Sequence, residues 1–135
     1  MTFFIDKINH NGDNKVGIID NIDKRKSMIK KKITSNALKE ANNIATILVK
    51  KFGAKEVILF GSLLNNRYFN SASDIDISVK GLGDKYYKAY GYCIRHSKFN
   101  LDIRAYEDMP NNFKININRK GLYLYGKKKF KKRDN

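Results

Sequence analysis

The chain has 135 residues, 41% of them hydrophobic, and a single cysteine, Cys93, which fits one folded domain and excludes an intramolecular disulfide. No apolar run approaches the roughly 18 residues of a membrane span, and Asp6 interrupts the first apolar run too early for a signal peptide, so we expect a cytoplasmic protein without membrane contact. The net charge of +15 lies in two flanks, since residues 21–51 hold 9 basic and 2 acidic residues and residues 109–135 hold 9 and 1. These flanks could attract a polyanion such as RNA, or their lysines could only solvate the surface.

The N-terminal third of the chain predicts an extension followed by a long helix. Residues 1–20 contain two short apolar runs around the turn-rich cluster NHNGDN, which could close a hairpin. Over residues 22–52, apolar residues recur at helical spacing, as Ile29, Ile33, Ala37, Ala41, Ile44 and Leu48. Gly53 then fits the position that ends such a helix.

The middle of the chain alternates strand and helix patterns. EVILFGS predicts a buried strand, SLLNNRY a helical turn, and SDIDISVKG a second strand. GDKYYKAYGYCIRHS predicts a helix with Asp84 as its N-cap. Its inner face is expected to carry Tyr86, Tyr90 and either Cys93 or Ile94.

The C-terminal part predicts two more strands around a short helix. FNLDIRAY alternates apolar and polar residues, the pattern of a half-buried strand. Pro110 is expected to open a helix that ends at Gly121, and LYLYG to form the last strand. We therefore expect an α+β fold with a small four-stranded sheet, in which residues 1–20 form an extension, 21–126 the domain and 127–135 a basic tail.

Two aspartates, Asp74 and Asp76, alternate with Ile75 and Ile77 in the second predicted strand. Because residues two apart on a strand point to the same face, both carboxylates should emerge side by side while the isoleucines enter the core. Carboxylates this close repel each other unless a cation lies between them. Paired hard oxygen ligands are what Mg²⁺ prefers, together with substrate phosphates, so the pair predicts a metal-nucleotide site.

Three further residues fit such a site. Gly61 and Ser62 directly follow a buried strand, where a glycine lets a ligand approach the backbone and a serine hydroxyl and free N–H groups can hold phosphate. Asp102 belongs to the polar face of FNLDIRAY, and it joins the other carboxylates if this strand lies beside the DIDIS strand. In two-metal phosphoryl transfer, such a carboxylate binds the metal nearer the attacking hydroxyl.

A family resemblance rests on these motifs. LFGSLLNNRYFNSASDIDISV, followed by FNLDIRAYEDMP and INRKGLYLYG, resembles the minimal nucleotidyltransferases (MNT) of the DNA polymerase β superfamily over residues 41–126. The shared pattern is a Gly-Ser step, a short spacer, an Asp-x-Asp strand and a later strand with a third aspartate. The resemblance implies a polymerase β-like fold, with a small mixed sheet flanked by helices, that transfers a nucleoside monophosphate from an NTP with two Mg²⁺ ions as cofactors.

The resemblance also implies roles for individual residues. Gly61 and Ser62 would hold the triphosphate of the NTP. Asp74 and Asp76 would bind the two Mg²⁺ ions, and Asp102 would bind metal and orient the acceptor hydroxyl.

One part of the pattern differs from its relatives. They often carry an arginine within the first few residues after the serine, whereas this chain has LLNN at positions 63–66 and Arg67 only later. Either Arg67 or Arg104, which shares the polar strand face with Asp102, would then supply the phosphate contact.

The resemblance also implies a partner. Similar proteins commonly accompany a HEPN ribonuclease toxin, and the family's antitoxins neutralise it by adenylylating a tyrosine near its active site. This implies transfer of AMP from ATP to a protein hydroxyl. An RNA acceptor such as a tRNA 3′ end is one alternative, which the basic flanks favour. A non-catalytic toxin-binding module is another, and the oligomeric state, homo- or hetero-oligomeric, stays open.

Overall fold

A four-stranded mixed sheet organises the fold in the structure, a computed structural model that describes residues 14–65 and 69–126, with side chains from residue 21 onward. Its strands are β1 (Glu56–Phe60), β2 (Asp74–Lys80), β3 (Asn100–Ala105) and β4 (Leu122–Tyr125), in the spatial order β3-β2-β1-β4. β1 pairs antiparallel with β2 and with β4, whereas β2 and β3 run parallel. All four strands lie where the sequence pattern predicts them.

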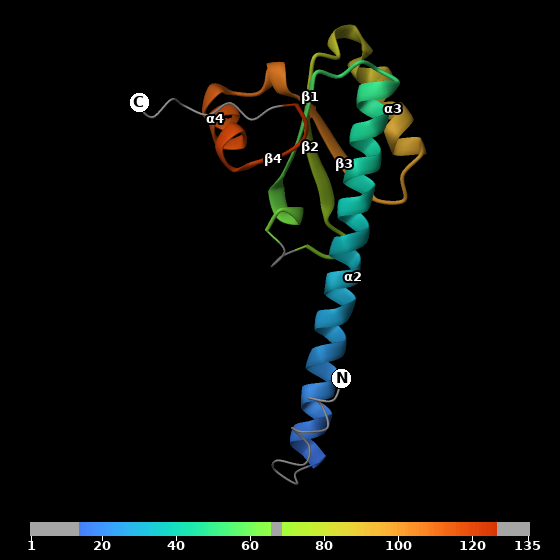
Figure 1. Ribbon diagram of the computed structural model, residues 1–135, viewed down its shortest axis with the longest axis vertical. Coiled ribbons are helices and arrows are strands. Elements are labelled where there is room, and N and C mark those ends of the chain that lie inside the picture. The colour runs from blue at the N-terminus through green and yellow to red at the C-terminus, as the bar shows by residue number, and fades with distance from the viewer. Residues whose placement is uncertain (1–13, 66–68, 127–135) are drawn as a thin grey trace. The chain divides into compact units, whose positions relative to one another are not determined.

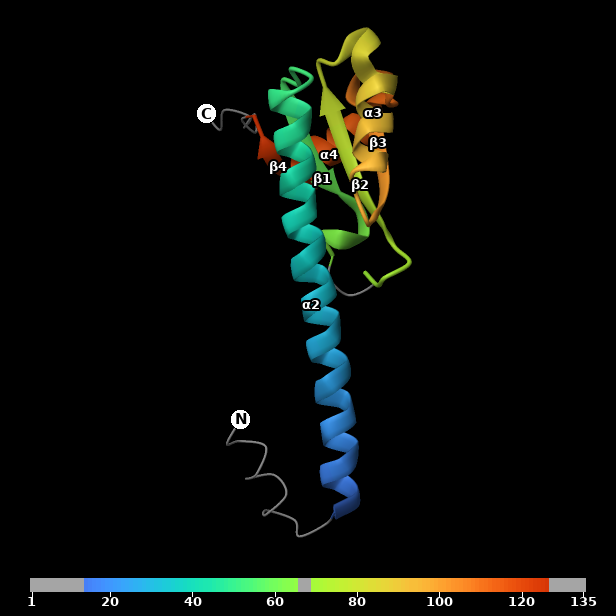
Figure 2. The ribbon, with the colours of Figure 1, turned by 90° about the vertical axis from the view of Figure 1, so that its right-hand side faces the viewer.

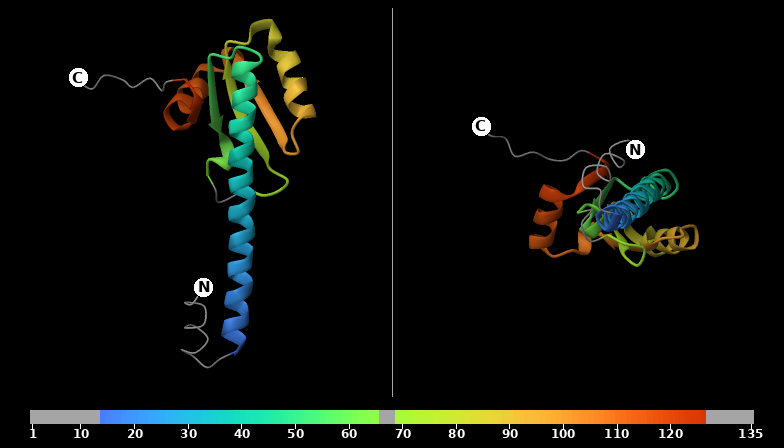
Figure 3. Two further views of the ribbon diagram at one scale, coloured as in Figure 1. Left: turned by 45° about the vertical axis from the view of Figure 1, so that its right-hand side comes forward. Right: turned by 90° about the horizontal axis from the view of Figure 1, so that it is seen from below.

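Helices cover both faces of this sheet. The α-helices of the described residues are α2 (Asn14–Lys50), α3 (Tyr86–Arg95) and α4 (Asn111–Lys120), and the short 3-10 turns are η1 (Gly61–Leu63), η2 (Gly83–Lys85) and η3 (Tyr106–Asp108). The C-terminal part of α2 and α3 lie on one face (Figure 1, Figure 2), and α4 lies on the opposite face (Figure 3, right). This confirms the expected α+β class. None of these described helices is both long and apolar enough to cross a bilayer.

The main core lies between the sheet and the pair of helices α2 and α3. Leu59, Ile77 and Ile103 are partners across β1, β2 and β3, and each is at most 1% exposed. The fully buried helix residues are Ala37, Ala41, Ile44, Leu48, Ala89 and Cys93. Of the two residues considered for the inner face of α3, Cys93 is therefore the buried one, whereas Ile94 is 51% exposed.

A second, smaller core lies between β1 and α4. It consists of Ile58, Met109 and Ile117, with Phe60, Phe113 and Tyr123 packed against it. Because Ile58 and Phe60 alternate with Leu59, β1 carries apolar side chains on both faces, as a strand covered from both sides must.

Two predicted helix ends are confirmed. Gly53 follows α2 with a φ of +76°, a left-handed conformation that favours glycine, and its N–H donates to the Val49 carbonyl at 3.0 Å. Helix α4 begins directly after Pro110 and ends before Gly121, as expected.

The predicted N-cap of α3 is wrong. Asp84 lies inside η2, because the Lys85 N–H donates to the Leu82 carbonyl and closes a 3-10 turn before the α-helix starts at Tyr86. The residue at the N-cap is Lys85, which makes no side-chain capping bond.

The predicted apolar stripe of α2 is confirmed only in part. The chain divides into two units, Met1–Ile33 and Thr34–Asn135, and α2 belongs to both. In the second unit the stripe is buried as expected. Ile29, expected on the same stripe, is 60% exposed, because the described residues of the first unit form only a helix and supply nothing to cover it.

The hairpin considered for residues 1–20 is wrong in its second arm. Helix α2 begins at Asn14, so residues 14–20 are helical. The segment contains no proline, and the single Gly17 disfavours a helix by only about 1 kcal/mol, which propagation from the following turns overcomes. The first arm and the basic tail at 127–135 lie outside the described residues.

The assigned core predicts that substitutions of a buried and of an exposed isoleucine differ in their effect on stability. Ile77 is fully buried, whereas Ile115 on α4 is 58% exposed. We expect Ile77→Ala to lower the free energy of unfolding by about 3 kcal/mol, since it leaves a cavity in the main core, and Ile115→Ala to lower it by less than about 0.5 kcal/mol. Urea unfolding measures both values, and equal losses would contradict the assigned core.

Candidate active site

The predicted carboxylates lie on one face of the sheet, at the end where β2 and β3 begin. In the parallel pairing of these strands, Asp74 is the partner of Asn100 and Asp76 is the partner of Asp102. Ile75 and Ile77 point to the opposite face and are fully buried. The expected neighbourhood of the FNLDIRAY and DIDIS strands is therefore confirmed, and it brings Asp76 and Asp102 side by side.

The parallel pairing depends on a crossover through α3. Parallel strands cannot be joined by a tight turn, and here η2 and α3 carry the chain from the end of β2 back to the start of β3. Two tyrosines of α3 secure the edge strand: the Tyr86 hydroxyl donates to the Ile103 carbonyl, and the Tyr90 hydroxyl donates to the Leu101 carbonyl at 3.2 Å. These bonds fix β3, and with it Asp102, against β2.

Crowding of the carboxylates changes the acidity of Asp76. The pKa of this side chain is raised to about 6 from the usual 3.8, mainly by its partial burial and in addition by the negative charges of Asp102 and Asp74. The positive charge of Arg104 acts in the opposite direction. Since like charges this close disfavour ionisation, a cation bound beside these carboxylates would favour their ionised form.

Arg104 holds Asp102 in an ion pair. The two side chains lie two residues apart on the same face of β3, and Arg104 Nη2 lies 3.1 Å from Asp102 Oδ2, with Nε at 3.3 Å from the same oxygen. The side chains remain 48% and 29% exposed, so the pair is open to solvent. The guanidinium is thus placed beside the carboxylates, whereas the other predicted phosphate contact, Arg67, lies outside the described residues.

Gly61 lies directly against Asp76. Its φ of +80° is in the left-handed region, and a Cβ atom built at this position would lie 2.1 Å from Asp76 Oδ2. Only a glycine therefore allows the backbone after β1 to approach the carboxylate this closely. Ser62 is half-buried and follows in η1, a turn of three residues.

The carboxylates fit a divalent metal by type and by position. They supply hard oxygen donors on one face, which Mg²⁺ prefers, and their mutual repulsion is the kind that a cation removes. They are not a preformed cage, because within residues 14–65 and 69–126 no three histidine, cysteine or acidic side chains converge on one metal position.

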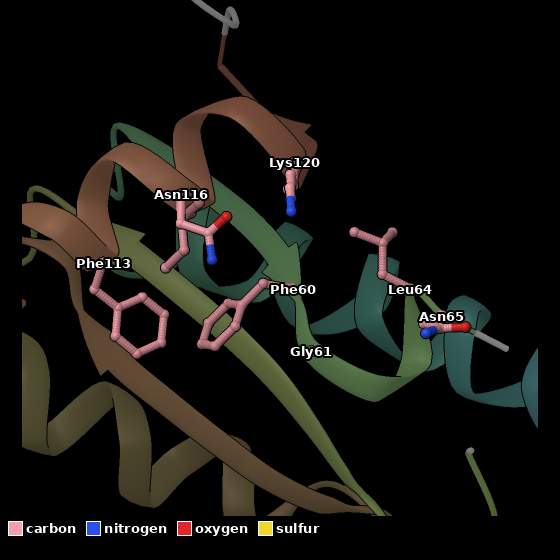
Figure 4. Close-up of a pocket in the computed structure, with 9 residues that line it drawn as sticks. Phe60, Gly61, Leu64, Asn65, Phe113, Asn116 and Lys120 are labelled. Carbon is pink, nitrogen blue, oxygen red and sulfur yellow. The ribbon is translucent and has the colours of Figure 1, made fainter. Parts of the chain in front are cut away.

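A pocket beside Gly61 was not anticipated from the sequence. It has a volume of about 470 Å³ and lies between the end of β1, η1 and α4. Figure 4 shows Phe60, Phe113, Asn116 and Lys120 around it. The available signal was the spacing of positions 113, 116 and 120 on one helix face, together with Phe60 directly before the Gly-Ser step.

Comparison with protein-family models identifies the family of this domain. A family model described as "Polymerase beta, Nucleotidyltransferase" matches residues 42–130, which include all four strands, Gly61, Ser62 and the three carboxylates. No curated protein matches the sequence.

The contact between Gly61 and Asp76 can be tested with two glycines of similar backbone conformation. Gly53 has a φ of +76° but no atom within 4 Å of a built Cβ. We expect Gly53→Ala to lower the free energy of unfolding by about 1 kcal/mol through backbone strain, and Gly61→Ala to lower it by about 1 kcal/mol more, because the carboxylate must move. Chemical unfolding measures both. The additional loss should shrink in an Asp76→Ala background, and an unchanged loss there would refute the contact.

The raised pKa of Asp76 predicts a pH dependence of stability in the metal-free protein. The folded state keeps the Asp76 proton up to about pH 6, whereas the unfolded chain releases it near 3.8, so stability falls as pH rises through this window. After allowance for solvent screening, we expect Asp76→Asn to raise the free energy of unfolding at neutral pH by about 1 kcal/mol and to have little effect below the window.

The matched control is Asp84→Asn, which removes an exposed carboxylate beyond the other end of β2. It should leave the pH dependence between about pH 4 and pH 6 as in the unsubstituted protein. Identical pH profiles for the unsubstituted protein and Asp76→Asn would rule out the raised pKa of Asp76.

Proposed function

Because the chain belongs to the polymerase β nucleotidyltransferase family, and so transfers a nucleoside monophosphate from an NTP, we propose that it is a minimal nucleotidyltransferase that uses ATP and modifies a hydroxyl group of a partner protein. The observation that carries the proposal is the register of β2 and β3, which pairs Asp76 with Asp102 directly beside Gly61. This register supports the proposal because it brings the Gly-Ser step, the Asp-x-Asp strand and the third aspartate of the motif together in space.

Three side chains are proposed to hold the metal. Asp74, Asp76 and Asp102 would bind two Mg²⁺ ions through carboxylate oxygens on the open face of β2 and β3. When bound, these ions would stabilise negative charge on the phosphates and lower the pKa of the attacking hydroxyl. Asp102 would orient that hydroxyl from the edge strand β3, where its side chain is 29% exposed.

Gly61 and Ser62 are proposed to hold the triphosphate. The missing side chain at Gly61 lets phosphate oxygens come close to the backbone next to Asp76, and the Ser62 hydroxyl would donate to them. Arg104 is the described arginine on the same face, and its exposed guanidinium would be available for a phosphate if it exchanged Asp102 for the ligand. Arg67 remains a second candidate for this contact.

The carboxylates are accessible to an acceptor group on a macromolecule. Asp74 is exposed and Asp102 is 29% exposed, so a side chain on a macromolecule can reach them. By the likeness to minimal nucleotidyltransferases, we extend the proposal to an antitoxin that adenylylates a tyrosine of a HEPN toxin.

RNA is the second candidate acceptor, and the charge favours it. The net charge is +15, and on α2 the side chains of Arg25, Lys26, Lys31 and Lys32 are exposed. Cationic side chains in such numbers bind polyanions by releasing condensed counterions. Labelling of RNA that is weaker when the reaction contains more salt, together with an unlabelled protein partner, would favour RNA as the acceptor.

The proposal predicts a labelling pattern. The protein is incubated with Mg²⁺, ATP labelled on the α-phosphate, and either total RNA or a co-expressed helical partner protein. We expect label on the partner protein, a reduction of at least about a hundredfold with Asp74→Ala, and no label without a divalent metal. Asp84→Ala, beyond the other end of β2, is the matched control and should transfer label normally. Equal labelling by Asp74→Ala, or no label on any acceptor, would overturn the enzymatic proposal.

A further inference from the structure

The pocket beside Gly61 has the composition of a site for a flat, partly polar molecule. Its walls include the rings of Phe60 and Phe113 and the apolar side chains of Leu64 and Ile117. The two rings meet edge to face with centroids 5.7 Å apart, so two aromatic side chains border the cavity at nearly a right angle. A volume of about 470 Å³ is in the range of pockets that enclose a small organic ligand.

Two polar groups point from α4 into this apolar setting. The Asn116 amide is directed toward Phe60, and the Lys120 ammonium extends into the space between Phe60 and Leu64 (Figure 4). Among the described residues neither group has a hydrogen-bond or ion-pair partner. An apolar pocket with a few unused, convergent polar groups is typical of a ligand site.

Other asparagines of the same helix are used differently. The Asn118 amide donates to the Tyr106 hydroxyl at 2.8 Å and accepts from the Tyr123 hydroxyl at 3.2 Å. Asn112 accepts a hydrogen bond from the Phe113 N–H. These two side chains stabilise the protein itself, which leaves Asn116 as the asparagine of α4 that faces the pocket.

The pocket is continuous with the carboxylate face. Gly61 lines the pocket and also lies against Asp76. Phe60 is the partner of Asp76 across β1 and β2, and paired residues of neighbouring strands point to the same face. A molecule whose phosphates lie at Gly61 can therefore place its adjoining part over Phe60 without crossing the sheet.

We infer that this pocket binds the nucleoside of the NTP, with the base against Phe60 and Phe113 and its edge bonded to Asn116. The inference rests on the proposed function and assigns the part of the substrate that the carboxylates do not contact. We take the base to be adenine, as in the proposed function, because a side-chain amide presents one donor and one acceptor side by side, which matches N7 and the amino group on one edge of adenine. Guanine presents two acceptors on the corresponding edge and leaves the amide oxygen unpaired.

The experiment compares two ligands that differ only in the nucleoside. Binding of ATP and of inorganic tripolyphosphate to the full chain is measured by calorimetry with Mg²⁺ present. We expect Asn116→Ala to weaken ATP binding about tenfold and to leave tripolyphosphate binding unchanged. Phe113→Leu, which keeps an apolar side chain but removes the ring, should act in the same direction, and GTP should bind the unsubstituted protein about tenfold less tightly than ATP.

Asn111→Ala is the matched control, because it removes an exposed amide of the same helix outside the pocket. It should leave ATP binding unchanged. Unfolding curves are measured for each variant, and we expect Asn116→Ala, at an exposed position, to leave the fold intact.

The failure of this inference differs from the failure of the proposed function. Unchanged ATP affinity in Asn116→Ala, or equal affinities for ATP and tripolyphosphate in the unsubstituted protein, would overturn the nucleoside site while label transfer still occurred. If Asn116→Ala weakened binding of the acceptor and left ATP affinity unchanged, the pocket would be assigned to the acceptor, and the nucleoside site would also be overturned. Absence of binding by both ligands, together with absence of label transfer, would overturn both proposals.

Discussion

The site depends on one constraint, which is that two carboxylates are held in register on neighbouring parallel strands. Asp76 and Asp102 are paired by the backbone, so neither can move away without breaking the pairing of β2 and β3. Partial burial of Asp76, together with repulsion from Asp102 and Asp74, raises its pKa to about 6. A protein that tolerates this arrangement gives up some stability at neutral pH, as is common where a functional site needs an unfavourable geometry.

The rest of the fold maintains this register and leaves the carboxylate face of β2 and β3 accessible. The tyrosine hydroxyls of α3 bind the outer carbonyls of β3, and the main core fixes the opposite face of β2. On the carboxylate face, α4 packs on β1 and leaves β2 and β3 accessible. Gly61 completes the arrangement, because the chain can turn beside Asp76 only where no side chain is present. The sheet, the crossover and one glycine therefore all help to fix the positions of the Asp76 and Asp102 carboxylates.

Local patterns were sufficient to predict the elements that a single strand or helix defines. The period of two in DIDIS predicted that Asp74 and Asp76 share a face, and the strand at FNLDIRAY predicted the placement of Asp102. Features that depend on several elements at once were not predictable. The pocket under α4 needs the tertiary arrangement. Ile29 has the helical spacing of a buried residue but no partner among the described residues of its unit. Asp84 was misplaced because a 3-10 turn displaced the helix start.

The central claim is that these carboxylates are crowded so that a divalent cation can neutralise them. The most direct measurement is the titration of the Asp76 side-chain carboxyl by carbon-13 NMR, with and without Mg²⁺, assigned by its loss in Asp76→Asn. The account predicts an apparent pKa of about 6 without metal and a fall to 3.8 or below when Mg²⁺ is added. An Asp76 that titrates near 3.8 without metal, and is unaffected by Mg²⁺, would contradict it.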